Sequence, residues 1–136
     1  MFSNKEKKHL LNVAREAIGA SLLNKKLEVE ILDSELLNKQ CGAFVTIKKQ
    51  KQLRGCVGLL TSDSRLQETV AQIAVSSATM DSRFSPLRIE ELKDIELEIS
   101  VLSPFETISD INVIVVGIHG LYISSGVRHG LLLPQV

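Results

Sequence analysis

A faultless alternation of apolar and polar residues over residues 95–101 is the feature that most constrains how this chain folds. The run Ile-Glu-Leu-Glu-Ile-Ser-Val puts every second side chain on the same face of an extended backbone. This pattern is typical of a β-strand with one buried and one solvent-exposed face, and Pro104 ends it. The chain therefore contains a half-buried strand.

Two other segments have the apolar spacing of helices. Residues 4–22 begin after a capping-box pattern at Ser3 and Glu6. A second capping-box pattern, at Ser64 and Gln67, precedes a helix that we expect to end near Met80. The expected buried positions are Leu10, Val13, Ala14, Ala17 and Ile18 in the first helix, and Leu66, Val70, Ile73, Ala74 and Ser77 in the second. Residues 25–39 alternate only weakly and predict no firm element.

Two β-hairpins complete the expected elements. The first joins residues 41–47 to residues 53–60 through a Lys-rich turn. The second joins residues 117–124 to residues 127–133, with a tight reversal at Ser125-Gly126. Residues 81–86 form a loop by composition. Helices mixed with hairpins predict an α+β fold rather than a doubly wound α/β fold.

Composition disfavours several classes of function. The 136 residues suffice for one domain, and 16 basic residues balance 16 acidic ones. A neutral chain with 4% aromatic residues and no Trp is unlike a nucleic-acid binder. With no signal peptide and no apolar run near the ~20 residues that span a bilayer, we expect a soluble cytoplasmic protein without a membrane partner. The three His and two Cys lack zinc spacing, so we predict no metal and no cofactor.

The most unusual stretch is Leu53-Arg54-Gly55-Cys56-Val57-Gly58. Glycine weakens a strand, and two glycines around one cysteine indicate a bulge, a bend, or the close approach of another backbone or a ligand. In a regular strand Arg54 and Cys56 share a face, where a positive charge favours the thiolate and a guanidinium can bind a carboxylate or phosphate. The alternative is structural: Cys56 is then a small core residue, and Arg54 is a surface ion-pair partner.

Three further residues are candidates for a site. His119 lies in Gly117-Ile118-His119-Gly120, where the flanking glycines let it face a cleft as a general base or thiolate partner. A buried structural histidine is the equal alternative. Asp81 and Arg83 lie in the loop after the second helix. Asp81 can order this loop by capping the helix or by pairing with Arg83 or Arg54, and such loops also supply ligand contacts.

The hexapeptide at residues 53–58 resembles the hallmark motif of the AMMECR1 family, with Val57 in place of the usual isoleucine. The resemblance runs from about residue 41 to the end of the chain. Further similar stretches follow in the same order: Asp81-Ser82-Arg83-Phe84 with Pro86-Leu87, Ile99-Ser100-Val101-Leu102, Gly117-Ile118-His119-Gly120-Leu121, and Gly130-Leu131-Leu132-Leu133-Pro134-Gln135-Val136.

This resemblance implies an α+β fold in which helices pack on an antiparallel or mixed sheet, with two subdomains and a cleft between them. It also implies that the Arg-Gly-Cys motif is the functional element. Similar prokaryotic proteins are encoded with or fused to Memo-like and radical-SAM proteins, which implies a protein partner of that kind. Ser82 stands where many relatives have proline, so the loop is expected to be less rigid.

Relatives also continue beyond the point that corresponds to Val136. We therefore expect residues 1–136 to form a single AMMECR1-like domain that is short at its C-terminus. If the further segment covers the core, its absence exposes apolar surface, and a homo-oligomer is expected.

Two functions remain open at this point. In the first, the protein is an enzyme in which Cys56 is a thiolate nucleophile, Arg54 binds an anionic group, and His119 is the base. In the second, a noncatalytic domain binds a small anionic ligand or a protein partner through the same cleft. The ligand would then contact Arg54, Arg83 or Asp81 and the backbone near Gly55 and Gly58, while Cys56 would only pack.

Overall fold

The computed structural model describes residues 1–135. The chain divides into two compact units, Met1–Pro104 and Phe105–Val136. Helices accompany antiparallel sheets, so the predicted α+β class is confirmed. Among residues 1–135, no helix combines the length and the apolar character that crossing a membrane requires.

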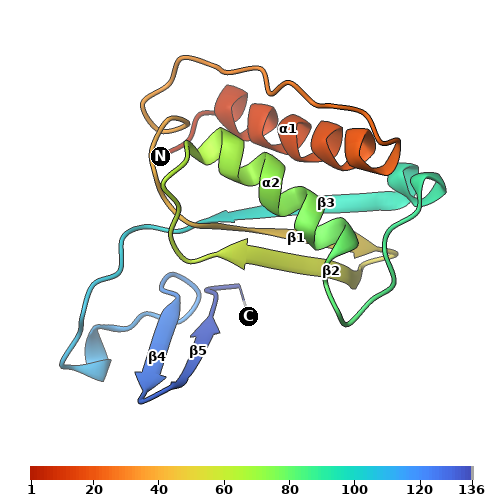
Figure 1. Cartoon of the computed structure of the whole chain (residues 1–136). Helices are drawn as coiled ribbons and strands as arrows, with labels where there is room; N and C mark the ends of the chain where they lie inside the picture. Colours follow the sequence, from red (N-terminus) through yellow and green to blue (C-terminus); the bar gives the residue numbers. More distant parts are fainter. Residues whose placement is uncertain (136) are drawn as a thin grey trace. The chain divides into compact units, whose positions relative to one another are not determined.

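A two-helix layer covers one face of a three-stranded sheet in the first unit (Figure 1). The helices are α1 (Asn4–Leu22) and α2 (Leu66–Thr79). The strands are β1 (Ala43–Lys49), β2 (Gln52–Leu59) and β3 (Ile95–Val101). They are ordered β2-β1-β3, and both pairs are antiparallel. The expected first hairpin is therefore confirmed, and β3 pairs with its other side.

The core lies between the helices and the sheet. The alternate residues Ala43, Val45 and Ile47 of β1 are completely buried. The same alternation holds in β3, where Ile95 is buried, Leu97 packs against the core, and Glu96 is exposed. The helices contribute Leu10, Ala14, Ile18, Leu66, Val70, Ile73, Ala74 and Ala78 to this core. Burial of such apolar side chains is the main favourable contribution to folding.

The start of α1 confirms the first capping box. The Glu6 N–H donates to the Ser3 hydroxyl at 3.2 Å, and the Glu6 carboxylate accepts from the Ser3 N–H at 2.8 Å. The helix spans Asn4–Leu22, as the periodicity predicts. Two N–H groups at the helix start, which have no partner within the helix, are thereby satisfied locally.

The start of α2 shows that the second predicted capping box, Ser64 with Gln67, is wrong. The N-cap is Arg65, and its N–H donates to the Glu68 carboxylate at 3.3 Å. Gln67 is instead fully buried, and its amide binds groups far away in the sequence. It donates to the Leu32 carbonyl at 3.0 Å and accepts from the Leu32 N–H at 3.1 Å. Its remaining partners are the side chains of Asn38 and His9.

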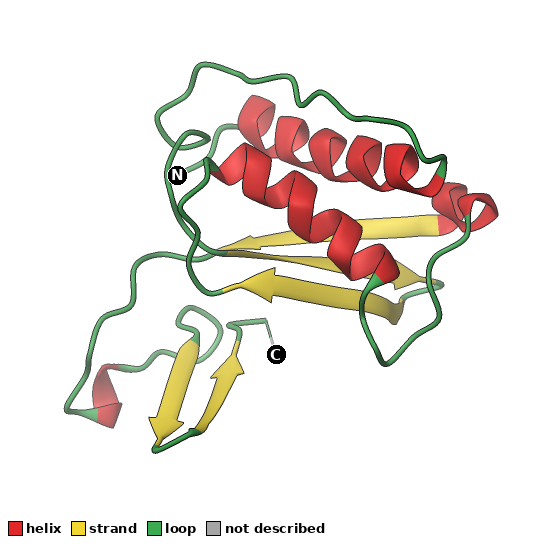
Figure 2. Ribbon diagram, viewed as in Figure 1, coloured by secondary structure: helices red, strands yellow, loops and turns green. Residues whose placement is uncertain are grey.

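Gln67 therefore anchors residues 25–39, which form no helix or strand and run alongside α1 (Figure 2). We expect Gln67→Leu to lower the free energy of unfolding by about 1–3 kcal/mol, because both partly buried backbone groups of Leu32 lose their partner. Gln72→Leu, the same change at an exposed position of α2, is the matched control and should cost less than about 0.5 kcal/mol. Urea unfolding measures both, and equal effects would contradict the anchoring role.

The second unit contains a short 3-10 helix, η2 (Ile111–Val113), and a hairpin. Strands β4 (Leu121–Ser125) and β5 (Arg128–Leu132) pair antiparallel, which confirms the second predicted hairpin. The reversal lies one residue later than predicted, at Gly126 and Val127, where Gly126 has a φ of 61°. Glycine adopts this left-handed conformation without steric cost. The ring of Tyr122 lies 5.4 Å from that of Phe105, centroid to centroid.

Candidate functional site

The C-terminal part of α2 packs directly on the backbone of β2. A Cβ atom on Gly55 would lie 2.2 Å from the carbonyl oxygen of Ser77. The buried Ser77 hydroxyl accepts a hydrogen bond from the Val57 N–H at 3.0 Å. It also donates to the Val45 carbonyl at 2.8 Å. At Gly55, the close approach that the sequence indicates is therefore an approach of α2.

Gly58 has a comparable packing constraint. A Cβ atom there would lie 2.4 Å from the Phe44 ring and 2.5 Å from the Ala43 carbonyl oxygen on the neighbouring strand. Both glycines are thus required by contacts within the first unit. Their predicted contribution to ligand binding stays a prediction.

Asp81 connects the loop after α2 to the middle of β2. Its carboxylate is 7% exposed and accepts the Cys56 N–H at 2.9 Å. It also accepts the Nε and Nη2 hydrogens of Arg83, at 3.0 and 2.8 Å. The hydrogen bond from Arg83, followed by that from Cys56, holds the pKa of Asp81 well below its usual range. An ionised Asp81 therefore fixes Arg83 next to Cys56.

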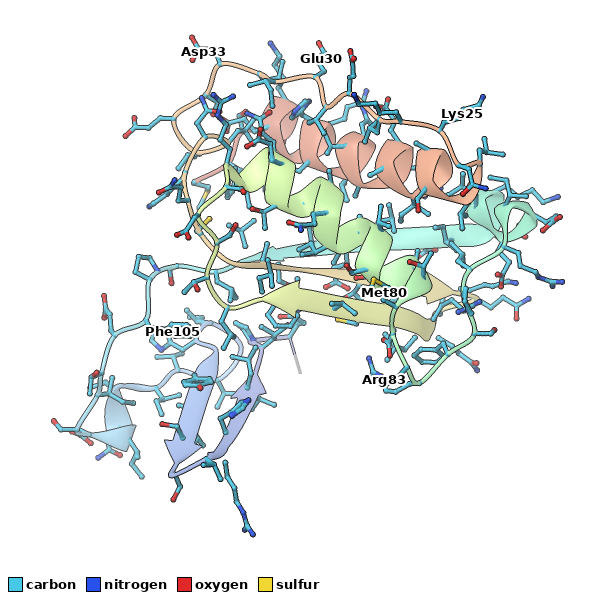
Figure 3. The ribbon with its side chains drawn as sticks, in the orientation of Figure 1. Lys25, Glu30, Asp33, Met80, Arg83 and Phe105 are labelled. Atoms are coloured by element: carbon cyan, nitrogen blue, oxygen red, sulfur yellow. The ribbon has the colours of Figure 1, made fainter. Side chains whose placement is uncertain are left out.

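Arg83 lies on the loop that follows Met80, the C-cap residue of α2 (Figure 3). Its side chain is 57% exposed, and Nη2 donates to the Cys56 carbonyl at 3.4 Å. The guanidinium carbon lies 5.5 Å from the centre of the Phe84 ring. Asp81, and to a smaller extent the charge on Cys56, raise the pKa of Arg83. Among residues 1–135, no group accepts a hydrogen bond from Nη1, so this edge of the guanidinium is open.

The Cys56 side chain is half-buried at a paired position of the sheet. Its Sγ lies 3.2 Å from the Thr46 hydroxyl, on the residue directly opposite in β1. A hydroxyl at that distance can donate to a thiolate, which is the reactive form of cysteine. Cys56 is thus not a buried core residue. Cys41 packs against the core instead, and burial raises the pKa of its thiol. Both cysteines are free.

Arg54 does not occupy the position beside Cys56 that a regular strand predicts. The register shifts so that Ile47 pairs with Gly55 and Lys48 pairs with Leu53, which leaves Arg54 as the extra residue of a β-bulge. Its guanidinium turns to the loop after α2 and to the 3-10 helix η1 (Ile89–Asp94). Arg83, and not Arg54, is the cation that contacts Cys56.

A buried carboxylate that the sequence analysis missed holds Arg54. Glu91 is 8% exposed and accepts from Arg54 Nε at 3.3 Å and Nη2 at 3.2 Å. It also accepts from Lys49 Nζ at 2.9 Å and from the Arg88 N–H at 2.8 Å. Nothing in the sequence separates Glu91 from its exposed neighbour Glu90. Arg54 is an ion-pair partner, as the structural alternative predicts, but the pair is largely buried.

His119 belongs to the second unit, whereas Cys56 belongs to the first. Its Nδ1 accepts the N–H of Val115 at 2.9 Å, and its backbone N–H donates to the Val115 carbonyl. The ring is exposed rather than buried. Its predicted role as the base for Cys56, and the predicted cleft between two subdomains, stay predictions. Within residues 1–135, His, Cys, Asp and Glu side chains form no group of three or more that would suit a metal ion.

The first unit is an α+β layer structure whose edge strand carries a bulged Arg-Gly-Cys sequence, with the cysteine next to a loop arginine. The chain belongs to the AMMECR1 family, whose profile matches residues 11–136.

Two relatives illustrate the similarity. A protein of Methanothermobacter thermautotrophicus is 38% identical over 142 residues, which cover 98% of this chain and 73% of the relative. A protein of Methanosarcina barkeri is 38% identical over 145 residues, covering 100% of this chain and 72% of the relative. The chain thus spans about seven tenths of each relative's length.

A solved structure also matches the fold. The crystal structure of uncharacterized protein PH0010 from Pyrococcus horikoshii aligns with a TM-score of 0.85 and 37% sequence identity. The alignment covers 93% of this chain and 68% of the other. The AMMECR1-like fold that the sequence motifs imply is therefore confirmed.

Proposed function

We propose that the protein binds a small anionic group, a carboxylate or a phosphate, at Arg83 beside the thiol of Cys56. The observation that carries this proposal is the open Nη1 edge of Arg83, on a guanidinium that Asp81 holds in one orientation. A guanidinium presents parallel N–H donors that match the oxygens of carboxylate and phosphate. A fixed orientation lowers the entropy lost on binding.

The charge of Asp81 limits the expected affinity. Asp81 neutralises part of the positive charge of Arg83. The electrostatic attraction of a bound anion to Arg83 is therefore weaker than its attraction to an isolated cation would be. A unit charge about 6 Å away in water contributes roughly 0.7 kcal/mol, or about a threefold effect. The site is therefore expected to select for charge without binding tightly.

The test uses the thiol as a reporter in a Cys41→Ser background. Rate constants for alkylation of Cys56 by iodoacetate, which is anionic, and by neutral iodoacetamide are measured by intact-protein mass spectrometry. Arg83→Gln is expected to lower the iodoacetate-to-iodoacetamide ratio about threefold. Inorganic phosphate, at ionic strength matched with chloride, should slow iodoacetate more in the parent protein than in Arg83→Gln.

Arg65→Gln is the matched control, because it removes the same charge at an exposed site. Arg65 precedes α2, whereas Asp81 follows it, and the 14 residues of the helix separate the two by about 20 Å. That separation exceeds the ~8 Å screening length at physiological salt, so the ratio should not change. A ratio that Arg83→Gln leaves at the parent value would contradict anion binding at this site.

The second candidate function is catalysis with Cys56 as thiolate nucleophile. The Thr46 hydroxyl lies 3.2 Å from the Cys56 Sγ, and Arg83 binds the Cys56 carbonyl at 3.4 Å. A hydrogen-bond donor and a cation are the kinds of neighbour that reactive cysteines have, which favours this function. In that case iodoacetamide should react faster with Cys56 in the folded protein than with the same thiol in urea-unfolded protein at pH 7. Equal or slower reaction would leave binding as the function.

The proposed location of the protein is the cytoplasm. The two free cysteines support this location, because disulfides are rare in reducing compartments.

A further inference from the structure

Arg54 is bonded to the far side of the loop that carries Arg83. Its Nη1 donates to the Ser85 carbonyl at 2.8 Å, and its Nη2 donates to the Pro86 carbonyl at 3.4 Å. With the two bonds to Glu91, these contacts use four of the five N–H groups of the guanidinium. The side chain is 16% exposed. Arg54 therefore has little capacity left for an added ligand.

The loop after α2 is held at two places on β2. Asp81, on its first arm, accepts the Cys56 N–H, and Arg54 binds the carbonyls of Ser85 and Pro86 on its second arm. Arg83 lies between these two anchors. The Leu87 N–H donates to the Ala78 carbonyl at 2.8 Å and so closes the base of the loop. This hydrogen bond does not constrain the tip of the loop, where Arg83 lies. The position of the Arg83 guanidinium thus depends on both arms.

We infer that Arg54 is a positioning residue, which places Arg83 for the anion instead of binding the anion itself. This inference rests on the proposed function. The bulge at Arg54 supplies the geometry, because the extra residue directs its side chain to the loop while Gly55 and Cys56 stay in register with β1. One strand segment thus presents the thiol and orients the cation beside it.

The test compares variants in the same Cys41→Ser protein by the iodoacetate-to-iodoacetamide ratio at Cys56. Arg54→Lys keeps the positive charge but lacks the planar fork that reaches two carbonyls and Glu91 together. We expect it to lower the ratio as far as Arg83→Gln does, by about threefold. The double variant should show no further decrease in the ratio, because both substitutions remove the same contribution, the guanidinium of Arg83 beside the thiol of Cys56. Both rates are compared under conditions where circular dichroism shows each variant to be folded, because an unfolded chain separates Arg83 from Cys56 and would lower the ratio by itself.

Lys49→Gln is the matched control. Lys49 binds the same carboxylate of Glu91 at 2.9 Å but does not bond to the loop carbonyls, so its loss should leave the ratio unchanged. Hydrogen exchange of the amides of residues 82–85 should become faster in Arg54→Lys and not in Lys49→Gln. If Arg54→Lys does not fold, Glu91→Gln replaces it, since it keeps Arg54 but removes the charge that holds it.

The outcomes separate the two proposals. If Arg83→Gln leaves the ratio unchanged, the proposed function fails. If Arg83→Gln lowers the ratio and Arg54→Lys does not, anion binding stands and the positioning role is overturned. A double variant that falls clearly below both single variants would make Arg54 an independent ligand, which also overturns positioning.

Discussion

Gly55→Ala is expected to lower the free energy of unfolding by at least about 3 kcal/mol. The added methyl group would lie 2.2 Å from the Ser77 carbonyl oxygen and 3.2 Å from its carbon, and both are backbone atoms that cannot turn away. Relief requires α2 to move off β2. That movement also weakens the hydrogen bond from the Val57 N–H to the buried Ser77 hydroxyl. Urea unfolding followed by circular dichroism measures the loss.

Gly19→Ala is the matched control in the same unit. Its added Cβ would lie 3.3 Å from the Leu92 Cδ2, the end of a flexible side chain. Alanine is favoured over glycine within a helix by about 0.8–1.0 kcal/mol, which offsets a small adjustment of Leu92. The variant should therefore stay within about 1 kcal/mol of the parent protein. If Gly55→Ala also stays within that range, the close approach of α2 is not as rigid as its contacts indicate.

Acid is expected to destabilise the protein through Glu91. The hydrogen bond from the Arg88 N–H, with those from Lys49 and Arg54, lowers the pKa of Glu91 to about 2 from an ordinary 4.5. Because the folded pKa lies below the unfolded value, the stabilisation is complete above pH 4.5 and is lost as the pH falls towards 2. Glu91→Gln should cost about 1–3 kcal/mol at pH 7, since it leaves Lys49 and Arg54 without their carboxylate.

The diagnostic result is the pH dependence of that cost. The difference in unfolding free energy between the parent and Glu91→Gln should shrink between pH 5 and pH 2, because the parent protonates the carboxyl that the variant lacks. Glu90→Gln, at the exposed neighbouring position, should follow the parent at every pH. Urea unfolding at several pH values decides this, and parallel curves for the parent and Glu91→Gln would exclude Glu91 as the source of acid sensitivity.

Local patterns predicted the elements well where backbone geometry alone sets the period of the side chains. The capping box at Ser3 and the apolar spacing after it gave the full extent of α1, and the alternation at residues 95–101 gave β3. Both hairpins were also predicted, with an error of one residue at Gly126. These features depend on neighbours within a few residues, which a single sequence contains in full.

The candidate site was predicted only in its parts. The sequence singled out the cysteine, the glycines and both arginines, but regular strand alternation placed Arg54 on the same face as Cys56. A bulge moved Arg54 out of register, and Asp81, 25 residues beyond Cys56, brought Arg83 there instead. Gln67 was misassigned for a similar reason, because its partner Leu32 lies 35 residues earlier. Strand alternation cannot reveal an extra residue that shifts the register.

The sequence by itself determined the α+β class, the family, and the segments that become helices and strands, because these follow from periodicities and motifs written along the chain. The tertiary structure decided which charges meet: Arg54 with Glu91, across 37 residues, and Arg83 with Asp81 at Cys56. Pairing of charges depends on distances in space, and burial determines its strength. Only the packing of α2 and its following loop on the bulged strand β2 establishes those distances.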